Sequence, residues 1–255
     1  MSALVADLPS GVLARVTTVL CDADDSLFPS EAPAFAASVE VTNRFLDAHG
    51  IGPRVTAEGL RAVATGSNFR TTARRLAADA GVEVADLDRW VAEEQRAVTA
   101  HLSATLTPDP QVIGPLTELG RHLTLAAVSS SALARLEGSF SATGLTALLP
   151  AGRPFSAEDS LPVPTSKPDP AVYLHACQQL GIAPAQGLAV EDSVAGATAA
   201  VRAGCPTVGN LCFVPPAERA QRQTELQRAG VLAVITSWQE LGDALLPAGT
   251  RRTAA

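Results

Sequence analysis

The stretch GLAVEDSVAGATAAVRAGCPTVG, at residues 187–209, decides the fold. It opens with GLAV at 187–190, a short apolar run that predicts a buried strand. A helix is predicted over VAGATAAVRAG, and PTVG predicts a second strand after it. A strand, a helix and a strand in this order form a right-handed unit whose two strands run parallel. The acidic pair Glu191 and Asp192 follows the first strand, at the sheet edge where ligands bind in such folds.

The same alternation extends over most of the chain. Strands are predicted at 15–21 (RVTTVLC), 123–128 (LTLAAV) and 231–235 (VLAVI), with helical patterns between the later ones. From Ala32 to about Ala104 the patterns are helical only. We therefore expect an α/β fold with a Rossmann-like parallel sheet, formed by residues 1–29 and 107–247, and an inserted all-helical domain at residues 30–106. The tail at 248–255 is expected to be disordered.

Composition excludes several classes of protein. The chain has 255 residues, of which 47% are hydrophobic, so a sizeable core is available. Its net charge of −7 and the lack of a basic stripe argue against a nucleic-acid partner. No run approaches about 18 consecutive apolar residues, so no membrane span is expected. Met1–Ser10 lacks a basic start followed by an apolar run, and the four cysteines lack metal-binding spacing, so we expect a cytoplasmic protein with free thiols.

Polar residues follow each central strand, at the edge where a ligand is expected. Asp22 and Asp24 come after the first strand, two residues apart, so an extended backbone would point both to the same side. One carboxylate can attack phosphorus, and the other can protonate the leaving oxygen and later activate water. Ser129 follows the second strand and can donate to phosphate oxygens, and Lys167 adds a positive charge. Carboxylates beside a phosphate dianion call for a hard cation, and Mg²⁺ is the expected one.

These motifs together resemble the haloacid dehalogenase superfamily in its phosphatase branch. The matching stretches occur in the family's order and are DADDSLF at 22–28, VSSS at 128–131, SKPDPAVYLHACQQLGI at 166–182 and the opening stretch at 187–209. The resemblance implies that Asp22 is the nucleophile and a metal ligand, and that Asp24 is the general acid and base with its backbone carbonyl on the metal. It further implies that Asp192 is the remaining metal carboxylate, with Glu191 supporting it.

The resemblance also assigns the groups that hold the substrate. Ser129 matches the phosphate-binding hydroxyl, Ser130 lies beside it, and Lys167 matches the lysine that neutralises nucleophile and phosphate. The helical insert looks like the cap of the β-phosphoglucomutase and phosphoglycolate phosphatase subgroup. Its segment TGSNFRTTARRL looks like that subgroup's specificity loop, which makes Gly66, Asn68 and Arg70 candidate substrate contacts.

One position departs from the family pattern, because Asp25 stands where the family usually has Gly. Strand alternation would place the Asp25 carboxylate opposite Asp22 and Asp24, so we expect it to face away from the phosphate pocket.

The favoured function is a Mg²⁺-dependent phosphatase that acts on a small phosphorylated metabolite, such as a sugar phosphate, as a monomer or weak homodimer. A phosphomutase of the β-phosphoglucomutase type is the main alternative. A histidine early in the helical insert would be expected of such a mutase, but the chain has no histidine between Asp24 and His49. A dehalogenase would lack the second acid, so the presence of that acid argues against dehalogenation. A catalytically weak binding module stays an alternative because Asp25 departs from the family pattern.

Overall fold

The computed structural model describes residues 8–64, 68–150 and 153–246. The chain divides into two compact units, and each is considered by itself. The sheet unit comprises Met1–Pro29 and Thr107–Ala255, and the helical unit comprises Ser30–Leu106.

The sheet unit is built on one six-stranded sheet in which all paired strands are parallel. Its strand order is β3-β2-β1-β4-β5-β6, so the chain order reverses between β1 and β4 at the centre. Ligands bind in such sheets outside the carboxyl ends of the strands at this reversal. The strands are β1 (Thr18–Cys21), β2 (Thr124–Ser129), β3 (Pro154–Ser156), β4 (Gly187–Glu191), β5 (Thr207–Asn210) and β6 (Ala233–Ile235).

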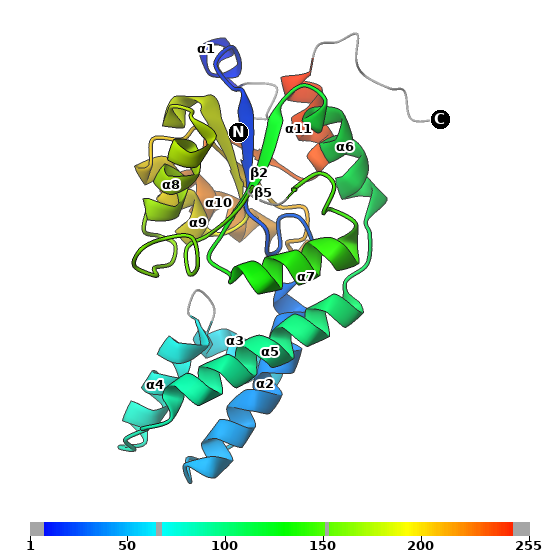
Figure 1. The fold of residues 1–255 in the computed structure, drawn as a ribbon. Helices are drawn as coiled ribbons and strands as arrows, with labels where there is room; N and C mark the ends of the chain where they lie inside the picture. Colours follow the sequence, from blue (N-terminus) through cyan, green and yellow to red (C-terminus); the bar gives the residue numbers. More distant parts are fainter. Residues whose placement is uncertain (1–7, 65–67, 151–152, 247–255) are drawn as a thin grey trace. The chain divides into compact units, whose positions relative to one another are not determined.

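Helices cover both faces of the sheet. In Figure 1, α8 (Ala171–Leu180) and α9 (Val194–Arg202) lie on one side, and α6 (Pro110–Gly120) and α11 (Trp238–Leu245) pack together on the other. The remaining helices of this unit are α1 (Ser10–Leu13), α7 (Leu133–Thr143), the 3₁₀ turn η2 (Pro184–Gln186) and α10 (Arg219–Ala229).

The central strands are apolar on both faces because helices cover both. Every residue of β1 and of β4 is buried, as expected for a parallel sheet that is enclosed on two sides. On the α8 side, Leu20 and Val128 of the sheet pack against Val172 and Tyr173 of α8 and against small residues of α9. The alanines of α9 allow this helix to lie close to the sheet.

The helical unit consists of α2 (Glu31–Ala48), α3 (Ala57–Ala64), α4 (Phe69–Asp79) and α5 (Leu87–Thr105). Its core is organised around Phe45 of α2, whose ring meets those of Phe69 and Trp90 edge-on at centroid distances of 6.4 and 5.8 Å. The Asp86 carboxylate accepts one hydrogen bond from Trp90 and lies 3.0 Å from the His49 ring. These contacts join both long helices to the α4–α5 connection.

The predicted fold class is confirmed: a parallel α/β sheet with an inserted, all-helical segment. Strand β3 was missed, because Pro154–Ser156 is only three residues long and has no alternating pattern. Among the residues that the structure describes, no helix is both long and apolar enough to cross a bilayer.

Two buried side chains donate hydrogen bonds to the turn that follows β1. The carbonyl oxygen of Ser26 accepts hydrogen bonds from Trp238 Nε1 at 2.9 Å and from Asn210 Nδ2 at 3.2 Å. Trp238 lies on α11 and Asn210 ends β5, so two distant parts of the chain fix the position of this turn.

Trp238→Phe should lower the free energy of unfolding by about 1–2 kcal/mol, because it removes a buried donor and leaves the Ser26 carbonyl with one partner. Urea unfolding followed by circular dichroism measures the loss. Trp90→Phe is the matched control, because its partner Asp86 has a 42% exposed side chain that water can reach. Equal losses in the two variants would contradict a special role for the Trp238 bond.

Candidate active site

The predicted site residues of the sheet unit converge at the carboxyl ends of β1, β2 and β4. Asp22 directly follows β1, Ser129 ends β2, and Glu191 ends β4 with Asp192 next to it. Lys167 reaches this edge from the segment between β3 and α8. All five side chains are buried, so their polar groups depend on one another rather than on water.

Lys167 occupies the centre of the cluster. Its Nζ donates to Asp22 Oδ1 at 2.5 Å, to Glu191 Oε1 at 2.7 Å and to the Val128 carbonyl at 2.8 Å. These three acceptors match the three protons of an ammonium group. Burial alone would lower the pKa of Lys167, but the Asp22 and Glu191 carboxylates outweigh it and raise that pKa above its ordinary value. Lys167 is therefore a permanent cation.

Glu191 is held by two donors on one of its oxygens. Oε1 accepts from Lys167 and from the hydroxyl of Tyr173, which projects from α8. Burial raises the pKa of Glu191 to about 7, and the Lys167 ammonium opposes this shift. The other oxygen, Oε2, is buried and has no hydrogen-bond partner within the described ranges. A Cβ placed on Gly196 of α9 would lie 1.7 Å from Oε2, so only glycine leaves room for this carboxylate.

Asp192 lies among negative charges. Burial raises its pKa well above the ordinary value, and the Asp22, Glu191 and Asp25 carboxylates add to the shift. Arg222 of α10 acts in the opposite direction, with Nη1 2.9 Å from the Asp192 carbonyl and 3.7 Å from its Oδ2. Burial likewise raises the pKa of Asp22, against the effect of Lys167.

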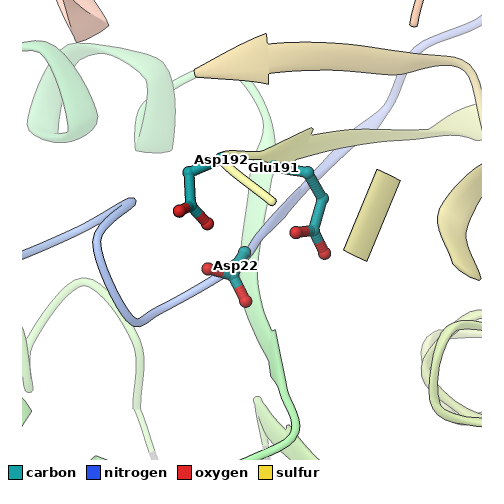
Figure 2. Close-up of side chains that lie close together, drawn as sticks. All are labelled: Asp22, Glu191 and Asp192. Atoms are coloured by element: carbon teal, nitrogen blue, oxygen red, sulfur yellow. The ribbon is translucent and has the colours of Figure 1, made fainter. Parts of the chain in front are cut away.

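The carboxylates of Asp22, Glu191 and Asp192 form a group that could hold a cation. One oxygen from each lies within 4.8 Å of the others, and Figure 2 shows the three side chains pointing toward a common space. Buried carboxylates outnumber the buried ammonium here, and Glu191 Oε2 lacks a partner among the described residues. Oxygen donors with excess negative charge fit a hard divalent cation such as Mg²⁺.

The serines that follow β2 have separate partners. Ser129 Oγ accepts from the Ser131 N–H at 3.0 Å, so its own proton remains available to donate. Ser130 Oγ accepts from the Lys167 N–H at 3.1 Å and so fastens the lysine segment to β2. Ser131 Oγ donates to Asp24 Oδ2 at 2.6 Å. The expected substrate contact of Ser130 stays a prediction, since the structure gives its oxygen a structural partner.

Asp24 is close to the β2–α7 segment and is not a member of the carboxylate group described above. Its Oδ1 pairs with Arg135 Nη2 at 3.2 Å, and its side chain is 30% exposed. Its expected role as a metal ligand through the backbone carbonyl stays a prediction.

The expectation for Asp25 was wrong in its premise. Strand β1 ends at Cys21, so alternation does not continue to Asp25. Asp25 instead has φ 53°, the left-handed conformation that glycine adopts most easily and that Asp tolerates better than most residues. Its negative charge contributes to raising the pKa of Asp192. The expectation that its carboxylate faces away from the phosphate pocket stays a prediction.

The candidate residues of the helical unit have local partners. Asn68 caps α4 by accepting from the Thr71 N–H at 2.9 Å, and Arg70 pairs with Asp88 at 2.5 Å. Arg70 and Asp88 also line a recess of about 320 Å³ together with Arg74. Gly66 lies outside the described residues. The substrate contacts expected for these residues stay predictions.

Sequence reasoning missed Tyr173, Arg135 and Arg222. Tyr173 stands six positions after Lys167 in the quoted stretch SKPDPAVY, so the motif itself contained the signal. Arg135 and Arg222 lie on helices α7 and α10, and their partners Asp24 and Asp192 are far from them in sequence.

Comparison with known proteins gives a family. A model described as haloacid dehalogenase-like hydrolase matches residues 16–204. A phosphoglycolate phosphatase from Thiobacillus denitrificans is 40% identical over 70 residues, which make up 28% of this chain and 30% of that protein. The chain spans about a third of the length of the curated relatives it matches.

Solved structures share the fold over nearly their whole length. A HAD family hydrolase from Deinococcus radiodurans, with bound phosphate and sodium, is 26% identical with a TM-score of 0.63, covering 92% of this chain and 100% of that one. CbbY from Rhodobacter sphaeroides, in complex with phosphate, is 20% identical with a TM-score of 0.70, covering 90% and 99%. At 20% identity the second likeness concerns the fold alone.

Gly196→Ala should lower the free energy of unfolding by about 1–3 kcal/mol, because the added methyl group displaces the Glu191 carboxylate from its place beside Lys167. Gly242→Ala in α11 is the control, since a Cβ there meets nothing within 4 Å. That change should stabilise the protein by up to about 1 kcal/mol through helix propensity. Chemical denaturation measures both, and a Gly196→Ala variant as stable as the unmodified chain would refute the close approach.

Proposed function

We propose, from the premise that this chain belongs to the haloacid dehalogenase-like hydrolase family, that it is a Mg²⁺-dependent phosphatase of small organic phosphate monoesters. The observation that carries the proposal is that the Lys167 ammonium donates hydrogen bonds to both Asp22 and Glu191. Asp192 and Ser129 lie next to them at the carboxyl ends of the central strands. This arrangement combines a carboxylate nucleophile, a fixed cation and a hydroxyl donor.

Asp22 is the proposed nucleophile. In the first step an Asp22 oxygen forms a bond to phosphorus while the bond from phosphorus to the ester oxygen breaks. Asp24, which takes up a proton from solvent before this step, gives that proton to the departing alkoxide. In the second step Asp24 takes a proton from water, the water oxygen bonds to phosphorus, and the aspartyl-phosphate bond breaks. Phosphate leaves and Asp22 is regenerated. Asp24 is ready for another cycle because it has regained its proton.

Lys167 and Ser129 hold the phosphoryl group in this scheme. Lys167 neutralises charge on Asp22 and on the phosphoryl oxygens, and Ser129 donates its remaining proton to one of them. Asp22, Asp192 and the Asp24 carbonyl would hold Mg²⁺, with Glu191 beside them. Mg²⁺ supplies charge neutralisation for a phosphate dianion among carboxylates.

The substrate is proposed to be a phosphorylated metabolite such as a sugar phosphate, with Gly66, Asn68 and Arg70 as candidate substrate-binding residues. Hydrolysis is favoured over phosphomutase activity because no histidine lies between Asp24 and His49.

Purified protein should release phosphate from p-nitrophenyl phosphate with Mg²⁺ present and lose this activity in excess chelator. The physical reason is that buried carboxylates without a cation repel the phosphate dianion. Restoring Mg²⁺ should restore turnover. Undiminished release in chelator would exclude the proposed metal dependence.

Asp22→Asn should reduce kcat more than a hundredfold, about 2.7 kcal/mol of transition-state stabilisation, because an amide is nearly isosteric but a poor nucleophile. Acid-quenched protein should contain phosphorylated aspartate only when Asp22 is intact. Asp169→Asn is the matched control, because Asp169 belongs to the SKPDP motif at 166–170 but its carboxylate accepts a hydrogen bond from the Ala171 N–H at the start of α8. A variant that keeps a tenth of the rate would show that Asp22 is not the nucleophile.

A further inference from the structure

The Asp24 carboxylate is held on one oxygen by Ser131, in the segment that joins β2 to α7, and on the other by Arg135 in the first turn of α7. Oδ2 accepts from Ser131 Oγ at 2.6 Å, and Oδ1 pairs with Arg135 Nη2 at 3.2 Å. Two donors on two oxygens fix both the position and the rotation of a carboxylate group, which one donor does not.

Ser131 also contacts Ser129, whose hydroxyl is proposed to bind phosphate. Ser131 donates its N–H to Ser129 Oγ and its hydroxyl proton to Asp24. A continuous chain of hydrogen bonds therefore runs from Ser129 through Ser131 to Asp24. The distance between the group that would bind the phosphoryl oxygens and the group that would serve the leaving oxygen is set by these few residues.

Arg135 has Asp24 as its ion-pair partner. Its side chain is 25% exposed, and in the described part of the chain Asp24 is the only carboxylate with which it forms an ion pair. Its Nε is buried, without a hydrogen-bond partner in residues 8–64, 68–150 and 153–246. A partly desolvated guanidinium is costly unless its carboxylate stays close. Arg135 therefore resists rotation of the Asp24 side chain away from the β2–α7 segment.

We propose that Arg135 and Ser131 are positioning residues that fix the Asp24 carboxylate for proton transfer at the leaving-group oxygen. This inference rests on the proposed phosphatase function. Its consequence depends on the ester: an alkoxide is a poor leaving group and needs the proton, whereas p-nitrophenolate leaves readily without it. Loosening Asp24 should therefore harm the hydrolysis of alkyl phosphates selectively.

The test measures kcat/KM for glycerol phosphate and for p-nitrophenyl phosphate with saturating Mg²⁺. This ratio covers the steps up to release of the alcohol, where leaving-group protonation acts. Arg135→Met and Ser131→Ala should each lose about tenfold or more on the alkyl ester and less than about threefold on the aryl ester. Arg135→Lys should recover part of the loss, because it keeps the charge but offers a less directional donor.

Arg121→Met is the matched control, since Arg121 pairs with Glu118 on the surface of α6 and should leave both esters unaffected. Ser131→Ala removes a single oxygen and keeps the test decisive if Arg135→Met fails to fold. Equal losses on both esters, or no loss on glycerol phosphate, would overturn the positioning role while leaving the phosphatase function intact. No turnover of either ester by the unmodified chain would instead overturn the phosphatase function, and this inference with it.

Discussion

The buried ammonium of Lys167 is the interaction on which the site depends. Its three acceptors come from the ends of the three central strands: Asp22 after β1, Val128 within β2 and Glu191 at the end of β4. Removing a charge from water is costly, and this cost is offset only while every partner stays in place. The lysine therefore holds the carboxyl edge of the sheet at fixed spacing.

The lysine compensates only part of the acidity around it. Asp22, Glu191 and Asp192 lie within one cation-sized group, and Asp25 contributes further negative potential at Asp192. Arg222 offsets some of this charge from α10. A bound cation stabilises an excess of buried carboxylates. Without a cation, these carboxylates repel an anionic ligand. Metal and phosphate binding at such an edge are therefore expected to be coupled.

The two sides of the site are supported differently. Glu191 is held by fully buried donors and by the clearance that Gly196 provides, so its position tolerates little change. Asp24 is partly exposed and is held by Ser131 and Arg135. The Glu191 carboxylate is thus fixed by the core, whereas Asp24, the proposed acid and base, is fixed by Ser131 of the β2–α7 connection and by Arg135 of α7. Asp25, with its left-handed backbone, begins the turn that Trp238 and Asn210 anchor at Ser26.

The sequence by itself determined the parallel sheet apart from β3, the helical insert, and the sheet edge at which Asp22, Ser129, Lys167 and Asp192 meet. It could do so because strand and helix periodicity is local, and because parallel strands bring residues that follow them to one edge. Only the tertiary structure decided that Glu191 accepts hydrogen bonds from Lys167 and Tyr173, that Arg135 pairs with Asp24, and that Asp25 adopts a left-handed backbone. Side-chain partners that are far apart in sequence depend on burial and helix packing, and local patterns carry no information on either.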